Sequence, residues 1–367
     1  APPVIFSTKM IPEVPVQGDS VFVSVYAGFS GGNLSGVIKG NLNEVPVEYP
    51  LYDDGLHNDS AAGDGIFRGF VKIAAPGDFA NLYVLMNGGG QYLSSAQFTY
   101  SLLIAGITTE DGFWTGRIWV PFRRDGIIAD VDLMGRSGLY YDSIYTLFSN
   151  GFALSGLIND VPWSASMMSA SRIDDYVAGP VGSPVIDPKN GIYRVALQDS
   201  AFGESWELWK YAVMTGARYW DGNHNGIYDP IDLNHNGIWD PTEDMPEILG
   251  EISYYCVYND GMPTELRRFQ EVPVGIEVRQ TIYAYPNSAV EAMKDAVFIR
   301  YEIVNKGNVA SEISDVFFSA WTDTDMGEYQ DDLFGTDSIR NSSYVWNEGS
   351  DGSFGVNPPA VFQTIVF

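Results

Sequence analysis

Residues 276–285 read IEVRQTIYAY, and this stretch alternates apolar and polar side chains with a period of two. Such alternation is typical of a β-strand that has one face on a protein core. The segments 295–305 and 315–321 repeat the pattern. Long strands with one polar face predict a large antiparallel β-sandwich in the C-terminal part of the chain.

The N-terminal part of the chain carries shorter strand patterns, at 21–26, 34–39, 67–73, 81–86 and 95–103. Short strands separated by Gly, Pro and Asn are typical of an immunoglobulin-like sandwich of about 100 residues. We therefore expect a mainly β chain with an Ig-like β-sandwich at 1–103, a linker at 104–112 and a larger β-sandwich domain at 113–367. The Gly-, Ser- and Pro-rich stretch 142–187 predicts short strands and long loops.

One helix interrupts the β pattern. Trp206, Trp209, Val213 and Ala217 recur at helical spacing, which gives the helix one apolar face. We expect this face to pack in a core. Exposed Trp rings at the same positions would instead suit sugar stacking.

The chain of 367 residues is strongly acidic, with 47 Asp and Glu against 20 Lys and Arg and a formal net charge of -27. Too few cations are present to neutralise phosphates, which excludes a protein dedicated to nucleic acid and disfavours anionic membrane surfaces. Hydrophobic residues make up 45% of the chain, enough for packed cores. No stretch reaches the roughly 20 apolar residues of a transmembrane helix.

The residues of common catalytic sites are scarce. The single cysteine, Cys256, excludes an internal disulfide and any Cys-based zinc site, and its strand-like neighbours predict a buried, unreactive thiol. The three histidines, His57, His224 and His235, all lie in acidic loops, which disfavours a Ser-His-Asp triad. A glycosidase needs only two carboxylates, but the sequence does not select a pair.

Residues 221–243 read DGNHNGIYDPIDLNHNGIWDPTE and contain two overlapping copies of a calcium-loop pattern. Calcium takes about six to eight oxygens, which such a loop supplies from positions 1, 3, 5, 7, 9 and 12 with Gly at position 6. The predicted ligands of the first copy are Asp221, Asn223, Asn225, the Ile227 carbonyl, Asp229 and Asp232. Those of the second copy are Asp232, Asn234, Asn236, the Ile238 carbonyl, Asp240 and Glu243.

The overlap of the two copies leaves no room for the paired helices of an EF-hand, and Pro230 and Pro241 disfavour them further. The segment therefore resembles the tandem calcium loops of thrombospondin type 3 and dockerin-like repeats. The resemblance implies two calcium ions in an insertion at 219–247. The alternative interpretation is a pair of Asn-Gly turns without metal.

Two further acidic clusters could hold cations by the same logic. The candidate ligands of the first, between two strands of the N-terminal domain, are Asp53, Asp54, Asp59 and Asp64. Those of the second, after the strand at 315–321, are Asp323, Asp325, Asp331, Asp332 and Asp337. Each cluster is also open to interpretation as a solvated loop rich in acids.

Several stretches carry a resemblance to bacterial surface proteins. The segment 51–67, LYDDGLHNDSAAGDGIF, is similar to one that recurs in Ig-like domains of large bacterial surface proteins. The segments 219–250, 256–261, 298–305 and 321–325 resemble uncharacterised secreted proteins of the Bacteroidota–Ignavibacteria lineages. The resemblance implies a secreted or cell-surface location, export as type IX secretion cargo, and calcium, but no activity.

These observations favour a calcium-stiffened extracellular protein with a structural or adhesive role, at the cell surface or in a filamentous assembly. Its partners would be further copies, other surface proteins or glycans. The alternative is a carbohydrate-binding or carbohydrate-active secreted protein, because 9 Trp and 22 Tyr residues offer stacking surfaces. A hydrolase with an unidentified carboxylate pair is a third hypothesis.

Overall fold

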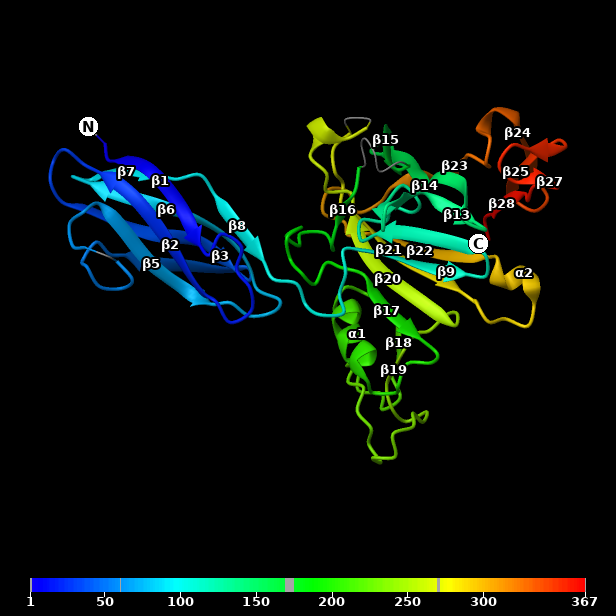
Figure 1. Cartoon of the computed structure of the whole chain (residues 1–367), viewed down its shortest axis with the longest axis horizontal. Coiled ribbons are helices and arrows are strands. Elements are labelled where there is room, and N and C mark those ends of the chain that lie inside the picture. The colour runs from blue at the N-terminus through cyan, green and yellow to red at the C-terminus, as the bar shows by residue number, and fades with distance from the viewer. Residues whose placement is uncertain (1, 60, 169–174, 269–270, 367) are drawn as a thin grey trace. The chain divides into compact units, whose positions relative to one another are not determined.

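The computed structural model describes residues 2–59, 61–168, 175–268 and 271–366. Over these ranges the chain is mainly β, which confirms the predicted class. Its two α-helices, α1 (Glu204–Met214) and α2 (Glu291–Lys294), are short. None of the described helices has the length and apolar character to cross a membrane. The chain divides into two compact units, Ala1–Ala105 with Ile186–Lys189, and Gly106–Val185 with Asn190–Phe367 (Figure 1).

The first unit contains two antiparallel sheets, with strand orders β1-β2-β5 and β4-β3-β6-β7, and β8 also pairs with β6. Val21, Val23 and Val25 alternate along β2 and are fully buried, and they share one core with side chains of the second sheet. The strands are β1 (Val4–Ile11), β2 (Ser20–Gly28), β3 (Leu34–Leu42), β4 (Val45–Leu51), β5 (Ile66–Ile73), β6 (Phe79–Gly88), β7 (Gln91–Ser94) and β8 (Phe98–Ser101).

The second unit is built around two larger sheets. One has the order β15-β14-β13-β10-β9, with β23 also paired to β14, and the other has the order β16-β20-β21-β22, with β17 also paired to β20. The strands are β9 (Glu110–Thr115), β10 (Ile118–Arg123), β13 (Leu139–Tyr141), β14 (Ile144–Ile158), β15 (Val161–Met167), β16 (Val177–Ala178), β17 (Tyr193–Ala196), β20 (Ile252–Asn259), β21 (Ile276–Ala284), β22 (Val297–Asn305) and β23 (Ser314–Thr324).

Smaller ladders complete the second unit. A three-stranded sheet has the order β24-β25-β28, and two-stranded ladders join β11 to β12, β18 to β19 and β26 to β27. Their bounds are β11 (Asp132–Leu133), β12 (Arg136–Ser137), β18 (Tyr219–Trp220), β19 (Met245–Pro246), β24 (Asp332–Asp337), β25 (Ser342–Asn347), β26 (Ser350–Asp351), β27 (Gly355–Val356) and β28 (Val361–Thr364), with 3-10 turns at Thr264–Leu266 and Tyr329–Asp331.

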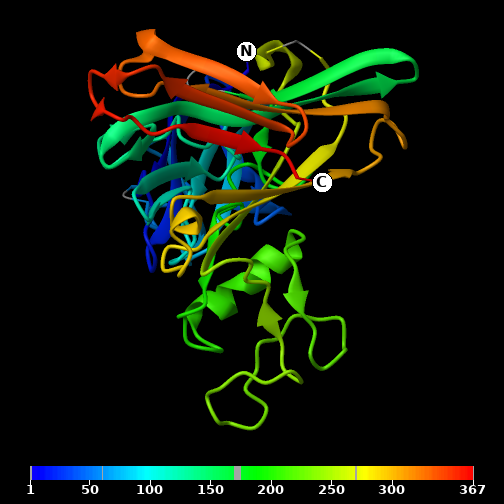
Figure 2. The same cartoon turned by 90° about the vertical axis from the view of Figure 1, so that its right-hand side faces the viewer.

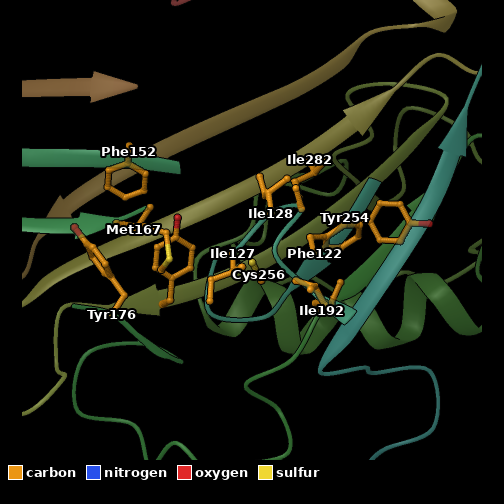
Figure 3. Close-up of a cluster of buried hydrophobic side chains, with 14 of the residues drawn as sticks. Phe122, Ile127, Ile128, Phe152, Met167, Tyr176, Ile192, Tyr254, Cys256 and Ile282 are labelled. Carbon is orange, nitrogen blue, oxygen red and sulfur yellow. The ribbon is translucent and has the colours of Figure 1, made fainter. Parts of the chain in front are cut away.

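The main core of the second unit is formed by both large sheets. Phe152 and Met167 come from the β14–β15 hairpin, and Tyr254, Cys256 and Ile282 come from β20 and β21 (Figure 3). The other face of β20 is covered as well, because its Tyr255 packs against Trp209 of α1 with ring centroids 5.9 Å apart. Burial on both faces explains why nearly every residue of β20 is buried.

Helix α1 contributes its aromatic face to this packing. Trp206 and Trp209 are buried, as is Ala217 after the helix end, and Trp209 Nε1 donates a hydrogen bond to the Arg218 carbonyl at 3.1 Å. The prediction that these Trp rings form core is confirmed. They are not a sugar platform.

Two strands differ from the expectation. The stretch 142–187 was expected to hold short strands, but it contains β14, which runs for 15 residues and pairs with both β15 and β23. The polar face of β21 was expected to meet solvent, but Glu277 and Thr281 are buried. Glu277 remains tolerable there because Arg279 pairs with it at 3.1 Å.

A buried ionic cluster lies where several of these strands begin and end. The side chains of Arg267 and Asp175 are fully buried, and Asp260 is almost so. Arg267 donates to the carbonyls of Asp260 and Asp175. Asp260 in turn accepts three backbone N–H groups of 274–276, at 2.6 to 2.9 Å, directly before and at the start of β21.

The packing of Cys256 gives a testable prediction. The thiol is buried, and burial raises its pKa well above the ordinary value, so little thiolate is present at neutral pH. We expect a thiol-specific reagent to label the native protein at least tenfold more slowly than the unfolded protein. The measurement is a timed labelling reaction at pH 8 with and without denaturant. Equal labelling rates would contradict a buried thiol.

Candidate metal centre

The predicted calcium-loop segment forms an insertion that is closed at its base by a short ladder. In this ladder Tyr219 pairs with Pro246 and Trp220 with Met245. Residues 221–244 extend from the ladder away from the sheets of the second unit (Figure 2). Tyr228 ties the insertion to helix α1, because its buried hydroxyl donates a hydrogen bond to the Trp206 carbonyl at 2.9 Å.

The first loop is organised by side-chain oxygens that accept backbone N–H groups. Asp221 Oδ1 accepts the N–H of Asn225 at 3.2 Å and Oδ2 accepts that of Gly226 at 3.0 Å. The amide oxygens of Asn223 and Asn225 each accept an N–H two residues further on. The side chains at positions 3 and 9 meet, because Asn223 Nδ2 donates to Asp229 Oδ1 at 3.2 Å.

The second loop repeats these contacts on the equivalent residues. Asp232 Oδ1 accepts the N–H of Asn236 at 3.1 Å and Oδ2 accepts that of Gly237 at 2.7 Å. Asn234 Nδ2 donates to Asp240 Oδ2 at 2.8 Å. Asp232 thus has the role in the second loop that Asp221 has in the first, and both of its carboxylate oxygens accept N–H groups of the second loop.

Glu243 closes the second loop from its C-terminal end. Its Oε1 accepts the N–H of Leu233 at 2.8 Å and its Oε2 accepts that of Asp240 at 3.1 Å. The Glu243 carbonyl accepts Trp239 Nε1 at 2.9 Å. One carboxylate thus fixes the second and ninth positions of the loop.

Asp244 does the same for the first loop. The N–H groups at its second and ninth positions, from Gly222 and Asp229, bind Asp244 Oδ1 and Oδ2 at 3.0 and 2.9 Å. The sequence pattern placed Asp232 at this closing position. It did not single out Asp244, which lies 22 residues after Gly222 and outside both copies of the pattern. In the structure Asp244 closes the first loop and Glu243 closes the second, whereas the pattern expected Asp232 to close the first loop and to open the second.

The two closing acids are buried side by side. Glu243 and Asp244 are each 1% exposed, and no ion pair within the described part of the chain involves either of them. Burial raises the pKa of Asp244, and the nearby Asp229 carboxylate adds to this effect. His224 and His235 are exposed. The Asp, Asn and Glu side chains of the insertion offer oxygens, the ligand type that Ca²⁺ and Mg²⁺ prefer.

The N-terminal acidic cluster lies between β4 and β5. Carboxylate oxygens of Asp53, Asp59 and Asp64 lie within 4.8 Å of one another and could hold a metal ion. Asp54 is not part of this group. Its carboxylate accepts the Leu56 N–H and pairs with His57 Nδ1 at 2.8 Å. The structure brings three of the four predicted residues together.

The C-terminal acidic cluster divides. Asp331 and Asp332 share the side chain of Asn347, whose Nδ2 donates to them at 2.6 and 3.3 Å. Asp332 also accepts the N–H of Met326 at 3.0 Å. Burial raises the pKa of Asp332, and repulsion by Asp331 and Asp325 adds to this effect.

The remaining three acids of that cluster have other surroundings. Burial and the neighbouring Asp323 raise the pKa of Asp325. Asp337 instead pairs with Arg340, whose hydrogen bond lowers the pKa of Asp337. These five residues do not form a group of three converging carboxylates among the residues that the structure describes.

A row of aromatic rings lies on one face of the sheet β24-β25-β28. We call Tyr344, Trp346 and Phe362 the aromatic row. Tyr344 lies opposite Phe362 in the ladder, and its ring centroid lies 5.5 Å from that of Phe362 and 5.2 Å from that of Trp346. Phe362 is 67% exposed. Nothing in the sequence beyond its aromatic content points to this row.

Comparison with known proteins leaves the family open. No family model matches the chain, and no curated protein matches it. Solved structures with partial similarity include a cycloalternan-forming enzyme of Listeria monocytogenes in complex with a pentasaccharide substrate (12% identity, TM-score 0.23, 44% of this chain and 17% of that one). Others are a Kfla1895 mutant in complex with isomaltose (10%, 0.19, 87% and 32%) and the uncharacterized protein lmo2446 of Listeria monocytogenes EGD-e with glucose, magnesium and calcium (7%, 0.23, 86% and 30%).

The chain spans about a third or less of the length of these structures. Their TM-scores are too low to carry an argument about its function.

Proposed function

We propose that this is an extracellular calcium-binding protein with a structural or adhesive role, and that the insertion at 219–247 binds two calcium ions. The second ion would be held by the predicted residues from Asp232 to Glu243. The first would be held by the predicted residues from Asp221 to Asp229, with Asp244 as the closing carboxylate. The ions would stiffen a long insertion that has little apolar core of its own.

The observation that carries the proposal is the buried pair Glu243 and Asp244. Two adjacent carboxylates are almost inaccessible to water. Backbone N–H groups bind both of them, but no Lys or Arg is paired to either in the described ranges. Burial of an unpaired charge is costly, and proteins normally offset it with a cation. A divalent ion in each loop would supply that charge.

The repetition of the hydrogen-bond pattern adds support. The same acceptor positions hold the same N–H groups in both loops, so the two oxygen sets have the same arrangement. The extracellular location itself rests on the resemblance to secreted surface proteins, and it extends the proposal to export as type IX secretion cargo.

Removal of calcium should destabilise the protein. An ion that binds only the folded chain at about one hundred times its Kd adds about 2.7 kcal/mol. For a unit of this size that corresponds to a fall in Tm of roughly 5–10 °C when a chelator is added. The measurement is a thermal melt with calcium, with chelator, and with calcium restored in excess. An identical Tm in all three would overturn calcium binding.

Neutralisation of either closing acid should remove one ion. We expect Glu243→Gln and Asp244→Asn each to weaken calcium binding at one site at least tenfold, because each keeps its size but loses a buried charge. The measurement is calcium titration by calorimetry, which counts the sites. Glu265→Gln, an exposed acid of the same unit, is the charge-matched control. If Asp244→Asn binds as many ions as the wild type, Asp244 is not a ligand.

A second candidate function is glycan binding at the aromatic row. The observation in its favour is that Tyr344, Trp346 and Phe362 place three neighbouring rings on one sheet face, and Phe362 is largely exposed. Such rings can stack against the apolar faces of sugars. Glycan binding is compatible with an adhesive role of the same protein.

The aromatic row can be tested by one substitution. If the row binds glycans, Phe362→Ala should weaken binding to a retained polysaccharide several-fold, because one stacking surface is lost. The measurement is a pull-down series with insoluble polysaccharides, followed by affinity electrophoresis. Tyr329→Ala removes an exposed ring outside the row and is the control. Equal retention of the two variants would exclude the row as the binding site.

A further inference from the structure

We infer that Asp53, Asp59 and Asp64 form a separate divalent-cation site in the first unit, with Ca²⁺ as the preferred ion. This site uses none of the residues of the tandem loops, so it stands or falls independently of calcium binding there. Three features support this site: the three carboxylates converge, one buried oxygen has no hydrogen-bond partner, and the site lies between two sheets.

The three carboxylates converge although they come from distant points of the connection. Their nearest oxygens lie within 4.8 Å of one another. Two oxygens on opposite sides of a calcium ion are about 4.8 Å apart, because each Ca–O distance is about 2.4 Å. The spacing of the three carboxylates is therefore compatible with one calcium ion bound to all of them.

Asp59 supplies the observation that points to a ligand. It is 7% exposed, and its Oδ1 is buried without a hydrogen-bond partner in the described structure. The other oxygen, Oδ2, accepts the N–H of Gly55 at 2.8 Å. A buried carboxylate oxygen with no partner is costly, and a cation among the three acids would satisfy it.

No side chain of the described protein forms an ion pair with these three acids. The neighbouring Asp54, by contrast, pairs with His57. The Arg68 guanidinium also reaches this connection, but it donates to the Asn58 carbonyl. Three negative charges therefore meet without compensation, and their mutual repulsion favours an external ion.

The connection is shaped to hold the acids in place. Asp53 Oδ1 accepts the N–H groups of Gly63 and Asp64 at 2.6 and 3.1 Å, and its Oδ2 accepts that of Gly65 at 3.1 Å. Gly65 has φ +82, and a Cβ there would lie 2.9 Å from the Ala27 carbonyl oxygen. Glycine is required at this point so that the chain can return to the start of β5.

The site would link the two sheets of the first unit. Asp53 and Asp59 follow β4, which belongs to the sheet β4-β3-β6-β7, and Asp64 precedes β5, which belongs to the sheet β1-β2-β5. A bound ion would add an ionic cross-link next to the bridge between Tyr52 and Arg68. Its absence would loosen this end of the sandwich.

The test uses the full chain in a background that disables the tandem loops, with both Asp221→Asn and Asp232→Asn. Calcium titration by calorimetry should still detect one ion. Adding Asp64→Asn should weaken its binding at least tenfold, because one of three charged ligands is lost. An amide oxygen can still accept the Ile66 N–H that Asp64 Oδ1 now holds at 2.9 Å, and equal melting curves in chelator will verify the fold.

Asp54→Asn is the matched control, since it removes the same charge from the same connection, and it should change the affinity less than twofold. The inference is overturned if the background variant binds no calcium, or if Asp54→Asn and Asp64→Asn weaken binding equally. Tighter binding of Mg²⁺ than of Ca²⁺ would overturn the assignment of the ion. If Asp221→Asn with Asp232→Asn leaves the wild-type stoichiometry unchanged, the tandem-loop proposal fails while this site is retained.

Discussion

The backbone N–H groups of long connections must be hydrogen-bonded, and in this protein aspartate carboxylates bind many of them. Asp53, Asp260 and Asp351 each accept three. A buried N–H without a partner costs about as much as a lost hydrogen bond, and β-sheets joined by long loops leave many such groups. Much of the net charge of -27 thus follows from the way the loops are held.

Hydrogen bonds to these acids satisfy the amides, but burial of the carboxylate charge itself costs free energy. Each buried acid therefore needs an opposite charge or hydrogen-bond donors around it. Asp260 is compensated within the chain, since its oxygens bind three N–H groups and Arg267 is buried beside it. Removal of one partner from such a buried pair typically costs about 3–5 kcal/mol. The cluster joins Asp175, which binds the Ser166 N–H of β15, to the start of β21, so both large sheets depend on it.

Features that depend on the local sequence were predictable. Features that depend on contacts between strands, or between residues distant in the sequence, were not. The alternation at 276–285 predicted β21, and the spacing of Asp, Asn and Gly at 221–243 predicted two loops of equal shape. Strand β14 was missed because its Gly residues resemble loop signals. At Gly151, however, the Met167 carbonyl oxygen of β15 approaches within 1.6 Å of where a Cβ would lie, so glycine is needed for close pairing. Asp244 was missed because its partners are distant in sequence.

Structural acids and candidate ligands differ in their surroundings. Asp260 and Asp59 are both buried aspartates that bind backbone N–H groups, yet only Asp260 has an arginine beside it, and only Asp59 keeps a buried oxygen without a partner in the described chain. The sequence shows that both residues are aspartates, but it does not show which of them has a cation beside it. Burial and the position of the nearest cation depend on the whole fold. Where the chain supplies the cation, the acid organises the core. Where it does not, the remaining charge is available to an ion from solution.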